Sequence, residues 1–274
     1  LSSTKVDVII TSGPPHSLHL IGLELKKTLE IKWISDFRDP WTEIDYFNQL
    51  PLTKKVRNKH HQLEQEVLIH SDAVLVVGNI MKEKYRQFSN NIHVLTNGFD
   101  TVNSPNDDIK LDTKFSITHI GLMNADRNPK MFWKVIADIC KENIGFYEDL
   151  EIKLIGKVSP EVDNSIKESK IDCVVKIDYL LHEQVLKHQQ QSQILLLAVN
   201  NVPSAKGIIT GKIFEYIQAK RPILAIGPVD GDLAVILKET NSGSIVDFDD
   251  EKALKNNILK MYADYKKDKL SIDS

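Results

Sequence analysis

The sequence predicts an α/β protein with two Rossmann-like domains, each built on a parallel sheet. Short β-branched runs alternate with helical stretches along the whole chain, a pattern typical of parallel strands covered by helices. The alternation pauses once, between Asn97 and Lys114, where Asn, Gly, Pro, Ser and Asp residues cluster as in a linker. We therefore expect one domain over 1–100 and a second over 101–250. For the helix expected within 251–274, packing back toward the first domain is one option.

The first domain is expected to hold only the later half of a Rossmann-like unit. Its apolar runs and periodic stretches predict three strands and three helices, in the order strand 6–11, helix 17–29, strand 32–35, helix 56–70, strand 73–77 and helix 80–88. The chain also opens without Met and passes almost at once into the first strand. We therefore expect an interior piece of a longer protein, with a trimmed or processed terminus as the alternative.

The second domain is expected to be complete. Its strands are predicted over 115–120, 151–155, 173–177, 194–199, 223–226 and 244–246. Its helices are predicted over 129–142, 182–190, 211–219, 233–239 and 251–267.

Composition narrows the function classes. The chain has 274 residues, of which 42% are hydrophobic and 27% charged, the profile of a soluble globular protein. Its 35 basic and 38 acidic side chains nearly balance, so we expect no nucleic-acid partner. Cys140 and Cys173 lack metal or disulfide spacing and fit reduced thiols in a cytoplasmic protein. Apolar runs such as 194–199 are too short to cross a bilayer, so any membrane contact is expected to be peripheral.

The helix expected to begin at Gly211 carries the most informative residues. Ligands of doubly wound sheets gather at the carboxyl ends of the strands, and a helix that starts there attracts anions with its unpaired N–H groups. Lys212 adds a cation, and an ionised Glu215 can accept hydrogen bonds from two neighbouring hydroxyls of a sugar. Together they suit a nucleotide sugar. The alternative is a solvated lysine and a glutamate that only complements the helix dipole.

A second candidate phosphate site lies in the loop 121–129. Gly121 permits close approach of a ligand, and Arg127 stands just before a helix that Pro129 could open. Arg127 is therefore our preferred phosphate-binding cation. The alternative is an ordinary capping turn.

Two loops of the first domain also carry unusual residues. His16 and His19 follow the first strand, in a turn where Ser17 is the expected N-cap. In the loop 36–42, Asp39 could act as an acceptor or weak base, Arg38 could hold a carboxylate or phosphate, and Trp41 could stack on a sugar ring. The alternatives are two incidental histidines, an internal Asp–Arg pair, and Trp41 as a core residue.

Two further patterns favour structural interpretations. Asp230 and Asp232 have a spacing that can hold a divalent metal, but they precede a predicted helix and fit turn and N-cap positions better. We therefore expect no metal ion and no other cofactor. The glutamine trio 189–191 is interpreted as a helix end.

Together these motifs resemble the retaining glycosyltransferases of family 4, which have the GT-B fold of two Rossmann-like domains. The resemblance covers essentially the whole chain and rests on residues 11–22, 36–41, 97–100, 121–129 and 212–222. It implies that Glu215 holds the donor ribose, that a basic residue such as Arg127 holds the diphosphate, and that the first domain contacts the acceptor. The sequence departs from the family at Gly207, where many members carry a glutamate toward the donor hexose.

The resemblance implies transfer of a hexose from a nucleoside diphosphate sugar to an acceptor hydroxyl, with retention at the anomeric carbon. The expected donor-binding residues are Gly121, Arg127, Lys212 and Glu215, and the expected acceptor-side catalytic residues are His16, Arg38 and Asp39. The implied acceptor is a glycan or a lipid-linked sugar of polysaccharide biosynthesis, handled in the cytoplasm or at the inner membrane face. With part of the first domain absent, we expect weak donor binding or no activity from this chain alone. A non-catalytic sugar-nucleotide-binding module and a sugar-nucleotide epimerase or phosphorylase of the same architecture remain the alternatives.

Overall fold

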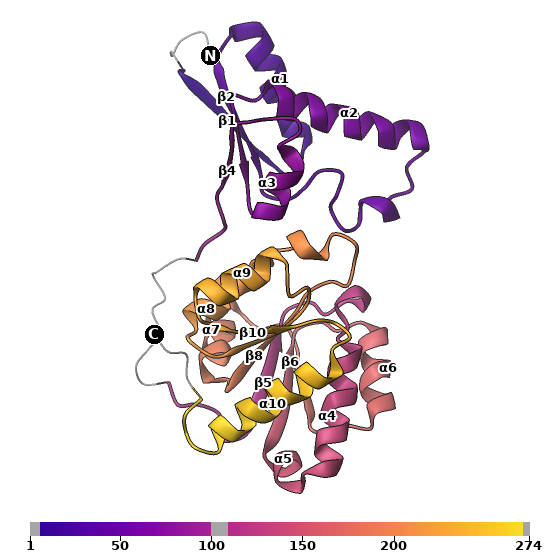
Figure 1. Ribbon diagram of the computed structural model, residues 1–274, viewed down its shortest axis with the longest axis vertical. Helices are drawn as coiled ribbons and strands as arrows, with labels where there is room; N and C mark the ends of the chain where they lie inside the picture. Colours follow the sequence, from indigo (N-terminus) through magenta and orange to yellow (C-terminus); the bar gives the residue numbers. More distant parts are fainter. Residues whose placement is uncertain (1–5, 100–108, 271–274) are drawn as a thin grey trace. The chain divides into compact units, whose positions relative to one another are not determined.

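A computed structural model describes residues 6–99 and 109–270, and these form two α/β units (Figure 1). The division falls between Asn97 and Gly98. The expected domain boundary at residues 100 and 101 lies outside the described residues, as does Asp100 of the motif at 97–100.

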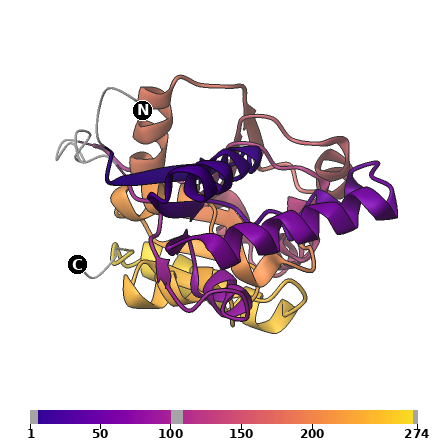
Figure 2. The same ribbon diagram turned by 90° about the horizontal axis from the view of Figure 1, so that it is seen from above.

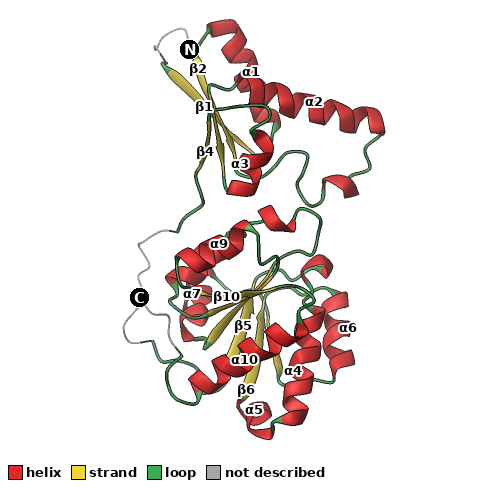
Figure 3. Ribbon diagram, in the orientation of Figure 1, coloured by secondary structure: helices red, strands yellow, loops and turns green. Residues whose placement is uncertain are grey.

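The first unit is a four-stranded parallel sheet covered by helices. Its strands pair in the order β1-β2-β3-β4 and its helices lie on one side of the sheet (Figure 3). The elements are β1 (Val8–Gly13), α1 (Ser17–Leu29), β2 (Lys32–Phe37), the 3-10 turn η1 (Phe47–Gln49), α2 (Lys54–His70), β3 (Ala73–Val76), α3 (Asn79–Tyr85) and β4 (Ile92–Val94). Alternate residues of β1 differ in exposure, because Ile9 packs on the core while Val8 and Ile10 are 44% and 62% exposed.

The second unit is a six-stranded parallel sheet in the order β10-β9-β8-β5-β6-β7, covered on both faces. Its strands are β5 (Phe115–Ile120), β6 (Leu150–Ile155), β7 (Val174–Ile177), β8 (Ile194–Ala198), β9 (Ile223–Ile226) and β10 (Gly243–Val246). Its α-helices are α4 (Lys130–Glu142), α5 (Ile144–Asp149), α6 (Pro160–Ser169), α7 (His182–Gln191), α8 (Lys212–Gln218), α9 (Asp232–Glu239) and α10 (Glu251–Tyr265), with the 3-10 turns η3 (Ala125–Arg127) and η4 (Ala205–Gly207).

Strand β8 shows why this sheet must be covered on both faces. All of its residues are buried, with Ile194 and Leu196 in the core under α4, α6 and α10, and Leu195 and Leu197 in the core under α8 and α9. Side chains of a strand point alternately to its two faces, so an uninterrupted apolar run requires a helix layer on each side.

Helix α10 contributes Leu254, Ile258 and Tyr262 to the core of the second unit and contacts α4. The Tyr262 hydroxyl donates a hydrogen bond to Asp149 at 2.7 Å. That residues 251–274 also reach toward the first domain stays a prediction.

The structure corrects several local predictions. The strand β4 and the helices α5 and α6 were not predicted, because β4 and α5 are only three and six residues long and α6 is rich in polar residues. Strand β1 begins two residues later than predicted and ends two residues later. His16, not Ser17, is the N-cap of α1, and no side chain caps that helix end. Helix α2 begins earlier than predicted, and the Thr53 hydroxyl caps its first turn. It is the long purple helix on the right of Figure 2.

Candidate functional site

The predicted donor-binding residues of the second unit gather at the carboxyl ends of β5 and β8. Gly121 follows β5 directly and has a φ of +100°, a conformation that favours glycine. A Cβ atom at Gly121 would lie 2.8 Å from Cε and 3.0 Å from Nζ of Lys212. The absence of a side chain at Gly121 therefore lets the Lys212 side chain lie across the end of the strand.

Lys212 is the first residue of α8, and its ammonium group lies in a partly buried, positively charged setting. Burial and the neighbouring Arg127 charge lower the pKa of Lys212 to about 7, while Glu215 opposes this effect. Two cations held close together at a strand end favour an anion between them, because an anion relieves both the repulsion and the desolvation.

His119, which was not selected from the sequence, is a buried hydrogen-bond partner of Lys212. It is 1% exposed, and burial and the Lys212 charge lower its pKa to about 3, so the ring is neutral. Its Nδ1 lies 3.1 Å from the carbonyl oxygen of Leu196 and therefore donates the proton there. That tautomer leaves the Nε2 lone pair facing Lys212 Nζ at 3.5 Å. The only sequence signal was a histidine inside the buried strand β5.

Arg127 ends the turn η3, and hydrogen bonds to the following loops orient its side chain. Its Nε donates to Oδ1 of the buried Asn200 at 3.0 Å, and a terminal nitrogen donates to the carbonyl oxygen of Leu122 at 2.9 Å. The Asn201 amide donates to the carbonyl oxygen of Asp126 at 2.7 Å, which joins the loops that follow β5 and β8. The guanidinium of Arg127 is thus placed near Lys212 by contacts from both loops.

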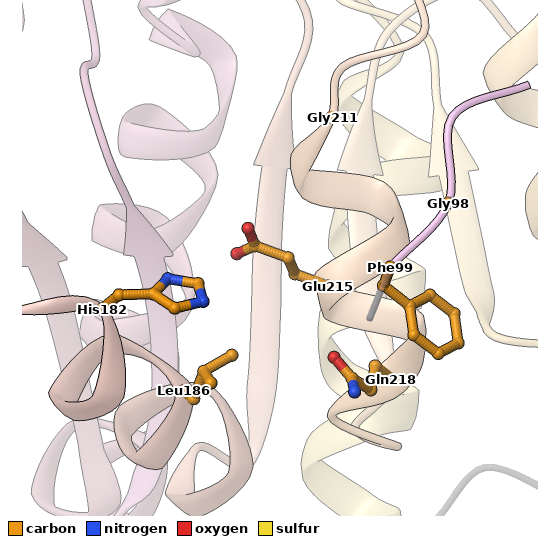
Figure 4. Close-up of a pocket in the computed structure, with 7 residues that line it drawn as sticks. All are labelled: Gly98, Phe99, His182, Leu186, Gly211, Glu215 and Gln218. Atoms are coloured by element: carbon orange, nitrogen blue, oxygen red, sulfur yellow. The ribbon is translucent and has the colours of Figure 1, made fainter. Parts of the chain in front are cut away.

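Glu215 lines a cavity of about 470 Å³ in the second unit. The cavity walls are formed by Gly98, Phe99, His182, Leu186, Gly211, Glu215 and Gln218. Figure 4 shows the Glu215 side chain pointing from α8 toward His182 and Leu186 of α7, with Phe99 and Gln218 at the later part of α8. Glu215 is half-buried, and Nε2 of Gln189 donates to its Oε2 at 2.9 Å. The Glu215 carboxylate is therefore neither buried among apolar side chains nor fully exposed to solvent.

The hydroxyl of Tyr216 explains part of the placement of α8 on the sheet. Tyr216 is fully buried, and its hydroxyl accepts a hydrogen bond from the Ile120 amide at 3.1 Å. Burial raises the pKa of this phenol. This contact fixes the first turns of α8, and hence Lys212 and Glu215, relative to the end of β5.

In the first unit, Arg38 and Asp39 follow β2 and are both exposed. The Arg38 guanidinium donates to the side-chain oxygen of Asn97, and its amide donates to the Gly13 carbonyl oxygen at 3.1 Å. Restricted hydration in the loop and the Asp45 charge raise the pKa of Asp39, whereas Arg38 lowers it. Both side chains remain available at the end of the sheet, where the sequence predicted them.

Buried Glu64, a residue that sequence reasoning missed, anchors the loop after β2. Its carboxylate accepts from the amides of Trp41 and Thr42, at 3.2 and 3.3 Å, and from the Tyr85 hydroxyl at 2.8 Å. Trp41 is 6% exposed and donates through Nε1 to His60. The prediction that Trp41 stacks on a sugar is therefore wrong, and the core alternative is correct.

The two histidines after β1 are packed against aromatic rings. The His16 ring stacks on Trp41 with centroids 5.4 Å apart, and burial lowers the pKa of His16 to about 4. His19 is fully buried and hydrogen-bonds Thr11 at 2.9 Å, and Thr11 also accepts from Trp33. His19 is thus a core residue, while an acceptor-side role for the neutral His16 stays a prediction.

Asp230 lies in a turn, as predicted, and forms an ion pair with Lys206 at 2.5 Å. The prediction that Asp232 is an N-cap is wrong, because Gly231 is the N-cap of α9 and Asp232 is its first residue. Within residues 6–99 and 109–270, no group of three or more His, Cys, Asp or Glu side chains is arranged to hold a metal ion. Over the same residues, no helix is both long and apolar enough to cross a membrane.

Comparison with known proteins gives structural matches only. No protein-family model matches the chain, and no curated protein matches its sequence. Sucrose-phosphate synthase from Thermosynechococcus elongatus superposes with a TM-score of 0.70 at 16% identity, over 96% of this chain and 66% of that one. A trehalose-6-phosphate structure from E. coli, bound with UDP-2-fluoro glucose, gives 0.66 at 11% identity, over 94% and 66%. WaaG, a glycosyltransferase involved in lipopolysaccharide biosynthesis, gives 0.62 at 10% identity, over 94% and 77%.

These matches define the fold. The chain has the GT-B architecture of two Rossmann-like units with parallel sheets, as the sequence predicted. It spans 66% of the length of sucrose-phosphate synthase, and its first sheet has four described strands where the second has six.

Proposed function

We propose that this protein is a glycosyltransferase that moves a hexose from a nucleoside diphosphate sugar to an acceptor hydroxyl, with retention of anomeric configuration. The observation that carries the proposal is the placement of Lys212 beside Gly121, where the charges of both Arg127 and the cavity-lining Glu215 act on its ammonium group. A pair of cations beside an open strand end suits a diphosphate, and a half-buried carboxylate suits a neighbouring pair of hydroxyls. UDP-2-fluoro glucose in the E. coli structure is a ligand of this chemical class.

In the proposed reaction, Arg127 and Lys212 stabilise the negative charge that develops on the departing diphosphate. Electrostatic stabilisation of this kind acts mainly on the transition state, where the leaving group carries more charge than in the bound donor. The two cations take the role that a metal ion has in other phosphate-releasing enzymes, so no metal or other cofactor is part of the proposal. Neutral His119 keeps Lys212 in place without adding a third positive charge.

The acceptor is proposed to be a glycan or a lipid-linked sugar. Arg38, Asp39 and His16 would orient it from the first unit, with Asp39 as the hydrogen-bond acceptor for the attacking hydroxyl. Restricted hydration and Asp45 raise the pKa of Asp39, which makes it a somewhat stronger base than an ordinary aspartate. The proposed setting is polysaccharide biosynthesis in the cytoplasm or at the inner face of the membrane.

Ligand-induced stabilisation tests the donor assignment. UDP, GDP, ADP, CMP and their sugars are added to the full chain while thermal unfolding is followed. A nucleotide at 100 times its dissociation constant should stabilise the chain by about 2.7 kcal/mol, a readily measured shift in the melting temperature. An unchanged melting temperature with every nucleotide and nucleotide sugar would refute the proposal. Once a donor is identified, the coupling constant of the anomeric proton in the product distinguishes retention from inversion.

One observation favours a second candidate, a non-catalytic sugar-nucleotide-binding module. Gly207, at the end of η4, stands where the resemblance would place a carboxylate toward the donor hexose. A chain without that carboxylate could still bind the nucleotide through Arg127, Lys212 and Glu215. This candidate predicts nucleotide binding with neither transfer nor hydrolysis at any acceptor concentration. A sugar-nucleotide epimerase would instead change the donor without an acceptor, and product analysis separates the three outcomes.

A further inference from the structure

Gln189 is a buried polar residue whose contacts point to Glu215. It lies in the last turn of α7 and is 1% exposed. Its Nε2 donates to Oε2 of Glu215 at 2.9 Å, and its Oε1 is buried without a hydrogen-bond partner among the described residues. A leucine would fill similar space without leaving a polar atom unsatisfied, which is costly. Packing alone therefore does not account for a glutamine at this position.

Three residues of α7 share one face that borders Glu215. His182, Leu186 and Gln189 have i, i+4 and i+7 spacing, so they line the same side of the helix. His182 and Leu186 form a wall of the cavity, and Gln189 reaches the Glu215 carboxylate itself (Figure 4). One helix thus both shapes the cavity and holds the carboxylate that lines it.

The direction of the hydrogen bond determines how Glu215 is held. An ionised carboxylate only accepts, so the Gln189 amide must present its nitrogen, and a flipped amide would set two oxygens 2.9 Å apart. One acceptor position on Oε2 is thereby occupied. In the described part of the chain, no other hydrogen bond to this carboxylate is found, so Oε1 and the remaining lone pair of Oε2 can accept. The amide fixes the orientation of the carboxylate as a whole.

We propose that Gln189 is a positioning residue that holds the Glu215 carboxylate so that it accepts hydrogen bonds from two adjacent hydroxyls of the donor nucleoside. This inference rests on the proposed function, because it assigns the Glu215 cavity to the ribose. It gives a role to the first residue of the glutamine trio, which the sequence had indicated only as a helix end.

Calorimetric titration of the full chain tests the proposal. UDP, GDP, ADP and CDP are titrated first, and the nucleotide that binds most tightly is then compared with its 2′,3′-dideoxy form. The variants are Gln189→Leu, Glu215→Ala and the double substitution, with Gln190→Leu as the matched control from the same trio. Gln190 is only partly buried. Gln189→Leu should weaken the ribonucleotide about 10-fold, the usual scale for a hydrogen bond to a charged group. It should leave the dideoxynucleotide within about twofold, because that ligand lacks the hydroxyls that the oriented carboxylate accepts.

The double substitution adds a second criterion. If Gln189 acts through Glu215, its replacement should have no further effect in the Glu215→Ala background. Gln190→Leu should bind both ligands as the parent chain does. Equal weakening of both ligands by Gln189→Leu, or additive effects in the double substitution, would overturn the positioning role while leaving the proposed function intact.

Two further outcomes are decisive. If the parent chain binds none of the four nucleotides, the proposed function fails and the role of Gln189 fails with it. If Gln189→Leu unfolds, as its melting curve would show, Gln189→Glu serves instead. A second carboxylate beside Glu215 should weaken the ribonucleotide more than the dideoxynucleotide, and an equal loss of both would refute the proposal.

Discussion

The lowered pKa of Lys212 predicts that diphosphate binding takes up a proton. Burial and Arg127 lower this pKa to about 7, from an ordinary value of 10.5. The negative charge of a bound diphosphate favours the ammonium form and should return the pKa toward its ordinary value. The chain should therefore take up a proton when it binds the proposed nucleotide, and the affinity should fall as the pH rises above 7.

The size of the effect follows from the fraction of protonated Lys212. With a pKa of about 7, that fraction falls from about one half at pH 7 to about 1% at pH 9, so the dissociation constant should rise about 50-fold. Between pH 6 and 7 the change should be only about twofold. His119 does not contribute in this range, because its pKa is lowered to about 3.

Calorimetry of the nucleotide in buffers of different ionisation enthalpy measures the uptake directly. About half a proton per nucleotide is expected at pH 7, and close to one at pH 8.5. Lys212→Arg is the matched control, since its guanidinium stays charged throughout and should show a nearly constant dissociation constant. A parent chain whose affinity is unchanged from pH 7 to 9, or an arginine variant with the same pH dependence, would refute the reasoning.

Three further substitutions test the site and its support. Arg127→Ala should lower turnover about 10²- to 10³-fold in an active enzyme, as steady-state rates with a saturating acceptor would show, and a near-normal rate would remove its role at the diphosphate. Gly121→Ala should destabilise the second unit by about 1–3 kcal/mol in denaturant unfolding, because φ is +100° and the new methyl meets Lys212. Its control, Gly211→Ala, should be neutral or slightly stabilising, because that position has helical angles and open space. Tyr216→Phe should cost about 1–3 kcal/mol by leaving the buried Ile120 amide without its acceptor, and an unchanged unfolding midpoint would contradict this role.

The sequence was sufficient for the fold because the pattern is local and repeated. An apolar run such as 194–198 is typical of a central strand in a parallel sheet that is covered on both faces. The alternation of such strands with helices along the chain predicted two Rossmann-like units. Local chemistry also placed Gly121 and Arg127 in a loop after a strand and Lys212 at the start of a helix. The polar residues that orient this site could not be predicted in the same way.

His119, Gln189 and Asn200 owe their roles to contacts between segments far apart in the sequence. His119 meets Lys212 across 93 residues, and Arg127 meets Asn200 across 73. The periodicity of a helix or a strand does not predict contacts between residues so far apart in the sequence. The error at Trp41 has the same origin, because the burial of its ring depends on His16 and His60, which lie on other elements.

The double burial of β8 has a consequence for how the second unit opens. Because alternate residues of this strand belong to cores on opposite faces, the detachment of either helix layer would expose apolar side chains of β8. Its amides should therefore exchange with deuterium only when the whole unit unfolds, and Asn200, two residues beyond the strand, is tied to the slowest-exchanging part of the sheet. The residues proposed to bind a diphosphate would then be attached to a strand that opens only on global unfolding, even if the surrounding loops move.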